Sequence, residues 1–435
     1  MIDDTIAAIA TASGIGGVGI VRISGPRAIA IACDVLGVPE LTREVRVGWA
    51  RGPGGERLDQ VLAFAMRSPA SFTGEDVAEL HGHGGPENLA RLLETVVARG
   101  ARVAEPGEFT RRAVGNGKLD LVRAEALLQV IHAGSERAWR IAQSNLGGRL
   151  GSAAEALETR VLGVLAEIEG RIDFPEEGIE PGDARDIERE LEGVRAACAR
   201  LADGFAHARA VGQGVAVALV GPVNAGKSSL LNALVGKERA LVAPLPGTTR
   251  DYLEVHDSWN GVAVTIIDTA GTRATADAIE ARGIALGEER VASADVVIVV
   301  NDGRDVWDDG ARYGHRSVVV RSKVDLGGDT HAAIATSATT GQGLDELRRR
   351  VLEVAGVAER EGSEEAFVTT ARQQAAAAAA RDALAAGLAA WRGGQVPEVI
   401  ALELRQAAQA LAQLRGVEVG DRVLDEVFAR FCIGK

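Results

Sequence analysis

The residues best suited to chemistry in this chain lie in the segment Gly221–Ser228, which fits the pattern G-x-x-x-x-G-K-[ST]. Its glycines let backbone N–H groups approach a phosphate without a Cβ in the way. Lys227 would reach the β- and γ-phosphates, and the hydroxyl of Ser228 would bind Mg²⁺. An apolar run, Val215–Val220, precedes the segment, and a helical pattern, Ser229–Leu234, follows it. This strand–loop–helix context favours a nucleotide site over a glycine-rich turn beside a core strand.

A second apolar run, Val262–Ile267, ends in the segment Asp268–Gly271. An acidic residue at a strand end can hold Mg²⁺ through water, and the N–H of Gly271 can contact the γ-phosphate and respond to its loss. Thr248 and Thr249 lie between the two motifs. A threonine hydroxyl there completes the Mg²⁺ shell only while triphosphate is bound, so we expect this segment to act as a switch.

The identity of the base is predicted by a third motif, Ser322–Asp325, which follows the apolar run Val318–Val320. The carboxylate of Asp325 can accept two N–H groups from guanine and would repel adenine. The segment Thr336–Ala338 would close over the base. In order and spacing these elements match a GTPase.

Ser322 stands where GTPases usually carry asparagine. A hydroxyl provides one hydrogen-bond donor where the amide provides two. We therefore expect weaker anchoring of the base loop and a lower guanine affinity, with selectivity kept by Asp325.

The residues expected to bind GTP are Asn224, Ala225, Gly226, Lys227, Ser228, Ser229, Thr248, Thr249, Asp268, Thr269, Ala270, Gly271, Lys323, Asp325, Ser337 and Ala338. Ser228 and Thr249 are the expected Mg²⁺ ligands, and Lys227 and Thr249 are expected to act in catalysis.

The elements that must position these residues belong to zones of different pattern. Up to about residue 117, short strands (19–23 and 61–65), a helix near 86–99 and glycine-rich turns, including 82–85, predict a small α+β domain. From about 118 to 210 the apolar period becomes helical. Its stripes are Leu121, Ala124, Leu127, Leu128 and Ile131, then Leu157, Val161, Leu165 and Ile168.

From about 211 to 360 strands alternate with helices, and from about 361 to 435 the pattern returns to helix, over 366–390 and 399–414. Helical zones on both sides of an α/β zone indicate an insertion, because the termini of a domain often lie close together. The predicted fold is a multidomain chain. It comprises an N-terminal α+β domain and a helical bundle interrupted by an α/β P-loop domain of the Ras-like GTPase type.

Composition limits the function classes. The chain has 435 residues, 46% of them hydrophobic, and no apolar run approaches the ~20 residues that a membrane span needs. The first residues lack the basic region of a signal peptide, so we expect a cytoplasmic location without membrane attachment. A net charge of −13 with only 3% aromatic residues argues against strong independent binding of RNA. We therefore expect a partner to provide many of the contacts to RNA.

The whole chain resembles the MnmE (TrmE) family of tRNA modification GTPases. The matching segments are Asp4–Thr11, Gly16–Pro26, Ser71–Gly85, Pro106–Thr110, Asn116–Leu121, Ile172–Glu177 and Phe431–Lys435. The resemblance implies a homodimer that works with a flavin-dependent partner of the MnmG (GidA) type, in a heterotetramer or larger complex, with FAD held by the partner. Together they would place an aminomethyl-type group, such as carboxymethylaminomethyl, on C5 of the wobble uridine of certain tRNAs.

The resemblance also implies that the N-terminal domain binds a tetrahydrofolate derivative (methylene- or formyl-tetrahydrofolate) and forms the dimer. Carried over by position, Arg22, Glu79, Lys118 and Lys435 would contact the folate. A pterin suits a carboxylate, and a glutamyl tail suits cations. Cys432 is left with two interpretations, a reactive thiol beside the folate or a packed terminal residue.

A further implication of the resemblance is a K⁺ ion where other GTPases use an arginine finger. Asn224, Thr248 and the backbone carbonyls of Ala243 and Leu245 match the K⁺ ligands, and Glu280 matches the glutamate that orients the attacking water. A cation there neutralises charge that develops in the transition state. We therefore expect K⁺-stimulated hydrolysis that depends on dimerisation of the GTPase domains.

Two alternatives remain. A ribosome-assembly GTPase acting on rRNA would share the switch motif, but it would carry an RNA-binding appendage or a second GTPase zone, and the sequence shows neither. His81 and His83 suggest a metal site, but no further ligand cluster accompanies them, so we favour local hydrogen bonds.

Overall fold

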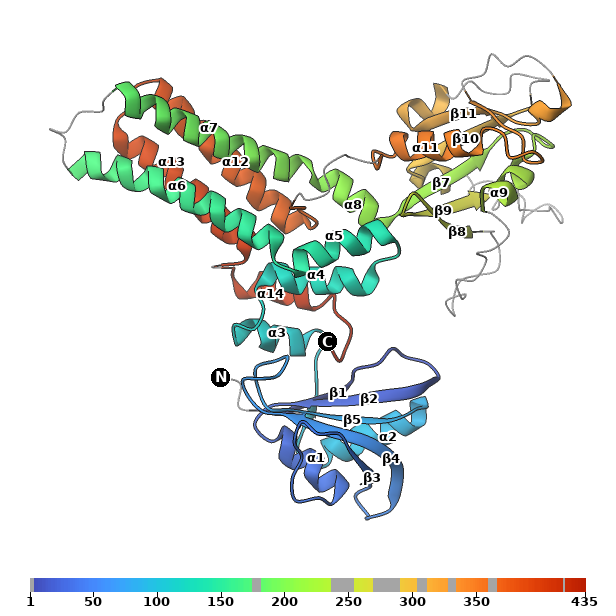
Figure 1. The fold of residues 1–435 in the computed structure, drawn as a ribbon, viewed down its shortest axis with the longest axis vertical. Coiled ribbons are helices and arrows are strands. Elements are labelled where there is room, and N and C mark those ends of the chain that lie inside the picture. Colours follow the sequence, from blue (N-terminus) through green and yellow to red (C-terminus); the bar gives the residue numbers. More distant parts are fainter. Residues whose placement is uncertain are drawn as a thin grey trace. The chain divides into compact units, whose positions relative to one another are not determined.

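The computed structural model describes residues 4–173, 181–235, 254–268, 290–302, 311–327, 334–358, 366–417 and 419–435. The chain divides into two compact units, Met1–Leu128 with Ala412–Lys435, and Gln129–Leu411. Figure 1 draws both units.

The first unit is built on a mostly antiparallel six-stranded sheet in the order β3-β4-β5-β2-β1-β6. Its strands are β1 (Ile6–Ile9), β2 (Gly16–Ser24), β3 (Arg46–Arg51), β4 (Arg57–Met66), β5 (Val77–Gly84) and β6 (Arg102–Val103). Its helices are α1 (Ala28–Leu36), α2 (Pro86–Val97), α3 (Glu108–Gly115) and α14 (Asp421–Phe428). The long helix α4 (Leu121–His132) begins in this unit, and α13 (Pro397–Arg415) ends in it.

Alternation along the strands separates a core face from a polar one. Val21, Ile23 and Leu80 are fully buried in the core that α1 and α2 complete. Because neighbouring side chains point to opposite faces of a sheet, Arg22 and Glu79 lie on the other face. The two face each other across the β2–β5 ladder.

One predicted glycine-rich turn is wrong, because close packing of glycines extends a strand into that segment. The segment after His81, interpreted as a glycine-rich turn, is mostly the end of β5, which extends to Gly84. A Cβ on Gly84 would lie 2.6 Å from the carbonyl oxygen of Gly16, so glycine allows β5 to continue beside β2.

The second unit contains a six-stranded sheet in the order β12-β11-β10-β7-β9-β8, parallel except for β8. Its strands are β7 (Val215–Val220), β8 (Glu254–Trp259), β9 (Val262–Asp268), β10 (Val296–Asn301), β11 (Ser317–Arg321) and β12 (Ile334–Ala335). Helices α9 (Lys227–Val235) and α11 (Leu344–Val354), with the 3-10 turns η1 (Ala311–Arg316) and η2 (Val324–Leu326), connect or cover them. The central strands β7 and β10 are apolar and buried along nearly their whole length, as expected for a parallel sheet with both faces covered.

The remaining helices of the second unit are α5 (Glu136–Leu146), α6 (Arg149–Asp173), α7 (Pro181–Asp203), α8 (Phe205–Gln213) and α12 (Ala371–Arg392). Figure 1 shows α6, α7, α12 and α13 side by side. Ion pairs join helices from before and after the α/β part, Arg392 with Glu188 at 2.7 Å and Arg405 with Glu169 at 2.6 Å. The predicted packing of the two helical zones against each other is therefore present.

Alanines form much of the buried surface of α12. The buried alanines are Ala376, Ala377, Ala380 and Ala383. Small side chains let helix backbones approach closely, and α12 packs extensively on α7.

The helices of the structure differ from the predicted helices at their ends. The segment 366–370 is not helical, and α12 begins at Ala371 after a capping box formed by Thr370 and Gln373. Ile131, the last residue of the first apolar stripe, is 43% exposed, whereas the stripe from Leu157 to Ile168 is buried. The domain limits at residues 117, 210 and 360 stay predictions.

Candidate functional site

The candidate phosphate loop joins β7 to α9 through backbone conformations that favour glycine. Gly221 and Gly226 have φ of +153° and +94°. A Cβ on Gly221 would lie 2.3 Å from the carbonyl oxygen of Val300, so a larger residue does not fit. The loop leaves Ser228 and Ser229 exposed in the first turn of α9, where the helix dipole favours an anion.

Lys227 is held directly over this loop. Its ammonium group donates to the carbonyl oxygens of Gly221 and Pro222, each at 2.8 Å, and the residue is 8% exposed. A phosphate accepted by the loop would meet this positive charge at hydrogen-bonding range. The residues present therefore fit the phosphates of a nucleotide.

Ser322 bonds the base loop to the phosphate loop. Its Oγ donates to the carbonyl oxygen of Ala225 at 2.5 Å, and it also lies 3.3 Å from the carbonyl oxygen of Asn301. The residue is 5% exposed, so this hydrogen bond is shielded from water. The serine thus anchors the base loop with its one donor, and the expected lower guanine affinity stays a prediction.

Lys323 and Asp325 complete the base loop. Lys323 has a left-handed backbone (φ +59°), and its ammonium group donates to the carbonyl oxygen of Asn224 and lies 3.6 Å from a carboxylate oxygen of Asp302. The stem of the lysine therefore lies across the phosphate loop. Asp325 follows in η2 with an exposed side chain, open to a ligand.

The segment after β12 is bonded to the base loop. The N–H of Val324 donates to the carbonyl oxygen of Thr336 at 3.3 Å, and the hydroxyl of Thr336 donates to the carbonyl oxygen of Arg321 at 3.1 Å. Ser337 is fully buried and Ala338 half-buried. The structure thus brings the phosphate loop, the base loop and the Ser337–Ala338 segment together.

Several predicted residues lie outside the described residues. These are Ala243, Leu245, Thr248, Thr249, Thr269, Ala270, Gly271 and Glu280. The backbone of Asp268 ends β9 and pairs with Leu219, which lies two residues before the start of the phosphate loop at Gly221.

A second cluster lies on the polar face of the N-terminal sheet. Glu79 is 7% exposed, and its two carboxylate oxygens lie 2.8 Å from Nε of Arg22 and 2.8 Å from Nε2 of His81. Burial alone would raise the pKa of Glu79, but hydrogen bonds from His81 and Arg22 hold that pKa below its usual value. Glu79 is therefore ionised near neutral pH.

One aromatic ring lies near Arg22 and another beside His81. The guanidinium of Arg22 lies 5.8 Å from the ring centre of Phe109, and the ring of Phe64 meets His81 edge-on at 5.4 Å. Neither ring belongs to the residues predicted to contact the folate. The period-2 pattern of β4 places Phe64 on the same face as Glu79, with which it pairs, so that alternation was an available signal.

The C-terminal segment lies against the same strands. Nη1 of Arg22 donates to the carbonyl oxygen of Gly434 at 3.4 Å. Gly434 has φ of +97°, and a Cβ there would lie 2.3 Å from the carbonyl oxygen of Ile9. This contact fixes the backbone of Gly434 beside Arg22; the neighbouring Lys435 is half-buried, and Cys432 is exposed.

Lys118 has a different local environment from the other three predicted folate contacts. Its Nζ donates to the carbonyl oxygen of Pro69 at 3.0 Å, and its stem lies beside Gly74. Lys118 is therefore bonded to the loop between β4 and β5.

The histidines follow the interpretation that we favoured. His81 bonds to Glu79, and Nδ1 of His83 lies 2.6 Å from a carboxylate oxygen of Asp59. Within the described parts of the chain, no cluster of three or more His, Cys, Asp or Glu side chains is suited to hold a metal ion.

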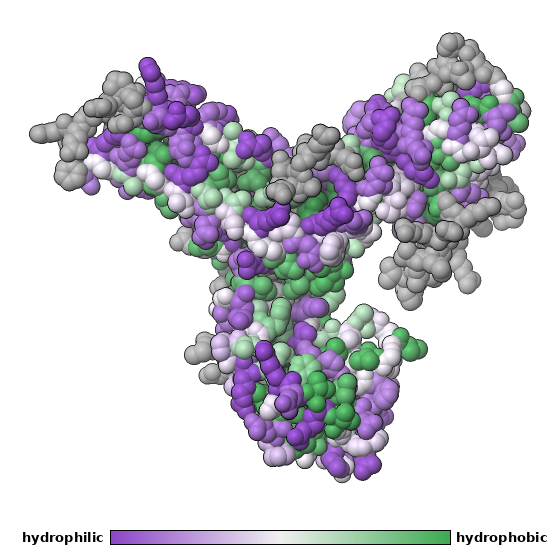
Figure 2. Space-filling view, in the orientation of Figure 1, coloured by the Kyte–Doolittle hydropathy of each residue, from purple (hydrophilic) through white to green (hydrophobic). Residues whose placement is uncertain are grey.

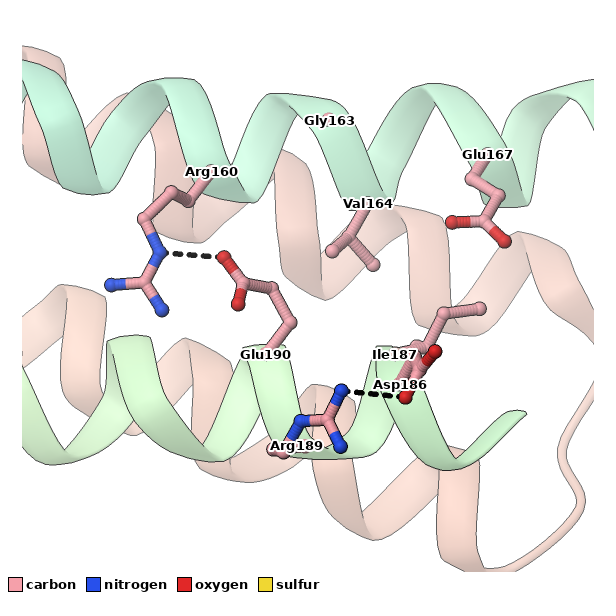
Figure 3. Close-up of a pocket in the computed structure, with 8 residues that line it drawn as sticks. All are labelled: Arg160, Gly163, Val164, Glu167, Asp186, Ile187, Arg189 and Glu190. Carbon is pink, nitrogen blue, oxygen red and sulfur yellow. Dashed lines mark hydrogen bonds and ion pairs between the residues drawn. The ribbon is translucent and has the colours of Figure 1, made fainter. Parts of the chain in front are cut away.

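A groove of about 530 Å³ lies between α6 and α7, apart from every predicted site residue (Figure 3). Its charged side chains pair with each other, Arg160 with Glu190 at 2.5 Å and Arg189 with Asp186 at 2.6 Å. We assign no ligand to this groove.

Comparisons with known proteins cover both units. A family model described as the GTP-binding protein TrmE N-terminus matches residues 5–118, and one described as the MnmE helical domain matches residues 121–432. A protein of Moorella thermoacetica named tRNA modification GTPase MnmE is 41% identical over 466 residues, covering 100% of both chains. A protein of the same name from a Synechococcus species is 43% identical over 449 residues, covering 100% of this chain and 99% of that one. Among the helices that the structure describes, none is both long and apolar enough to cross a membrane.

The anchoring role of Ser322 can be tested by Ser322→Ala. The substitution removes the donor to Ala225 and leaves a buried carbonyl oxygen unpaired, so GTP affinity should fall by about fivefold or more. Titration with a fluorescent GTP analogue measures this. Ser317→Ala, which removes an exposed hydroxyl bonded to Gly314, should leave the affinity unchanged. Comparable affinities of the unaltered protein for GTP and ATP would contradict the role given to Asp325.

The ionised state of Glu79 gives a dependence of stability on pH. A carboxylate whose folded pKa is lowered stabilises the fold above its ordinary pKa of about 4.5, and this contribution is lost as pH falls through the lowered value. Glu79→Gln should therefore lower the melting temperature near neutral pH, and the deficit should shrink below about pH 4.5. Thermal unfolding followed by circular dichroism checks this, with the exposed Glu87→Gln as the control. A deficit of equal size at both pH values would rule out this role for the charge.

Proposed function

The chain belongs to the MnmE family of tRNA modification GTPases, and from this premise we propose that its GTP hydrolysis serves modification of the wobble uridine of certain tRNAs. The modification would be an aminomethyl-type group, such as carboxymethylaminomethyl, on C5 of that uridine. The observation that carries the nucleotide assignment is the hydrogen bond between Ser322 and Ala225. It fixes the loop that would read guanine to the loop that would hold the phosphates.

In this proposal, different residues of the chain bind the phosphates, read the base, hold Mg²⁺ and orient the attacking water. Lys227 and the N-terminus of α9 bind the phosphates, and Asp325 reads the base. Ser228 and Thr249 would hold Mg²⁺, which supplies charge neutralisation at the phosphates. Glu280 would orient the attacking water.

We propose further that K⁺ supports hydrolysis. Asn224 is an exposed residue of the phosphate loop with φ of +66°, and its carbonyl accepts a hydrogen bond from Lys323, so its backbone is fixed. Its amide oxygen would bind K⁺ with Thr248 and the carbonyls of Ala243 and Leu245. When bound, the cation supplies positive charge at the phosphates, and we expect it to require paired GTPase domains.

The N-terminal site is proposed to take a tetrahydrofolate derivative. An ionised Glu79 fits the N–H groups of a pterin, while Phe64 and Phe109 provide aromatic rings nearby. Arg22 donates to the carbonyl oxygen of Gly434, next to Lys435 in the chain, and cations there suit a glutamyl tail. Lys118 and Cys432 are proposed as contacts at the margin of this site.

We also propose binding partners for this chain, from its exposed apolar surface and its net charge. The N-terminal sheet exposes apolar side chains of β3 and β4, with Val47, Trp49 and Leu62 between 40% and 61% exposed. Figure 2 shows hydrophobic residues at the surface of this unit on the face in view. Such a surface suits a homodimer interface. A flavin-dependent MnmG-type partner would bring FAD and help to hold tRNA, because this chain is acidic overall. We propose a cytoplasmic location for the assembly.

Nucleoside mass spectrometry of tRNA tests the central proposal. Cells that lack this chain should lose the C5-modified wobble uridines, and the unaltered gene should restore them. A gene carrying Lys227→Ala should not restore them, because the phosphates lose their cation. Unchanged wobble uridines with accumulated ribosomal precursors would instead support the ribosome-assembly alternative.

The K⁺ proposal is tested by GTP turnover in KCl and NaCl at matched ionic strength. Turnover should be about tenfold or more higher in KCl, because the proposed K⁺ would supply positive charge at the phosphates. Asn224→Gly keeps the left-handed backbone but removes the amide, so it should abolish the difference. Val223→Ala, at a neighbouring side chain that is 88% exposed, should retain it. Equal turnover of the unaltered protein in both salts would refute the proposal.

A further inference from the structure

The first turn of α5 is bonded directly to the turn between β8 and β9. The backbone N–H of Arg137 donates to the carbonyl oxygen of Gly261 at 3.0 Å. Asn260 and Gly261 form that turn with φ of +48° and +74°. A Cβ on Gly261 would lie 3.1 Å from Cγ of Arg137, so glycine permits this close approach.

The side chain of Arg137 joins two more segments. Its Nη1 donates to the carbonyl oxygen of Val357 at 2.7 Å, just after α11. Its Nη2 lies 3.3 Å from Nε2 of His207, which belongs to α8 and is 8% exposed. Nδ1 of His207 in turn lies 2.9 Å from the carbonyl oxygen of Gly356.

These contacts favour the neutral tautomer of His207 that carries its proton on Nδ1. A carbonyl oxygen only accepts hydrogen bonds, so Nδ1 carries the proton. Arginine only donates, so Nε2 presents its lone pair to Arg137. We call Arg137, His207 and the backbone of Gly261, Gly356 and Val357 the junction clasp.

The junction clasp holds both ends of the α/β part. Helix α8 leads through Gly214 into β7, and Gly356 and Val357 follow α11, the last helix of that part. Gly214 packs tightly too, since a Cβ there would lie 3.0 Å from the carbonyl oxygen of Ala263 in β9. The chain thus enters and leaves the α/β part beside the same arginine.

The hairpin that the junction clasp holds lies between the two predicted switch segments. Thr248 and Thr249 precede β8, and β9 ends at Asp268. The two strands are paired without interruption from Glu254 with Ile267 to Trp259 with Val262. This ladder of six residue pairs spans roughly 20 Å, so it links the nucleotide end of the hairpin to the turn that the junction clasp holds.

A surface pocket lies beside α5 and α8. It has a volume of about 190 Å³ and lies among the end of α4, α5, α8 and Thr369. Ala138 and Ile141 of α5 and Ala208 of α8 line it, close in sequence to the clasp residues.

We propose that the junction clasp transmits nucleotide-dependent movement of the β8–β9 turn to α5 and α8, with Arg137 as the positioning residue. This inference rests on the proposed function, because it assumes that GTP and GDP change the switch segments. A clasp that merely stabilises the fold would lower the melting temperature when broken, but it would leave the response of α5 and α8 to the nucleotide intact.

Hydrogen exchange of the full-length protein separates these two roles. Exchange is measured by mass spectrometry in KCl with GDP and with a non-hydrolysable GTP analogue. In the unaltered protein, peptides 136–146 and 205–213 should exchange differently in the two states. In Arg137→Gln that difference should vanish, while peptide 221–235 keeps its own. GTP turnover should stay within about twofold, and tRNA modification should fall about tenfold because the two activities are uncoupled.

Matched variants separate an effect of the junction clasp from a general loss of structure. His207→Gln keeps one donor for Gly356 and one acceptor for Arg137, so it should retain the exchange difference, whereas His207→Leu should lose it. Arg140→Gln breaks an exposed ion pair with Glu136 on the same helix and should behave as the unaltered protein. If Arg137→Gln does not fold, the comparison of His207→Gln with His207→Leu decides the question.

The outcomes are distinguishable. Absence of GTP turnover in the unaltered protein would overturn the proposed function. Normal turnover with no exchange difference at α5 and α8 would overturn only this inference. A difference that persists in both Arg137→Gln and His207→Leu would do the same.

Discussion

The nucleotide site depends on the parallel hydrogen bonding of β7, β9, β10 and β11. Parallel strands present their carboxyl ends at a single edge, so the segments that follow them meet there whatever their distance in sequence. That geometry brings the segments after Val220, Asn301 and Arg321 together, and it sets the backbone of Asp268 beside β7. Because these strands consist largely of buried β-branched residues, the site inherits its rigidity from the core beneath it.

Local sequence rules were sufficient for this part of the chain. The phosphate loop, its strand and its helix follow from glycines, an apolar run and helical periodicity, all within about 20 residues. The strand expected before Ser322 is present as β11, and the base-reading role of the segment that follows it stays a prediction. The hydrogen bond from Ser322 to Ala225 was beyond such rules, since the two residues are neighbours only through the sheet.

Long-range packing determined what the sequence analysis missed. Gly82 and Gly84 favour a turn when considered alone, but Gly16 across the ladder makes them part of β5. Ile131 continues an apolar stripe, yet its position near the end of α4 leaves it exposed. Lys118 matches a family position, but its hydrogen bond to Pro69 depends on a loop whose course the sequence does not specify.

The alanine-rich packing of α12 has a mechanical consequence. Long side chains between helices act as compliant spacers, because their torsions absorb small displacements. Alanine has no such torsions, so the alanine-lined part of the buried face of α12 can absorb little displacement against α7. With 22 residues at ~1.5 Å each, α12 spans about 33 Å. A small rotation of α12 about one end would therefore displace its other end by a larger distance.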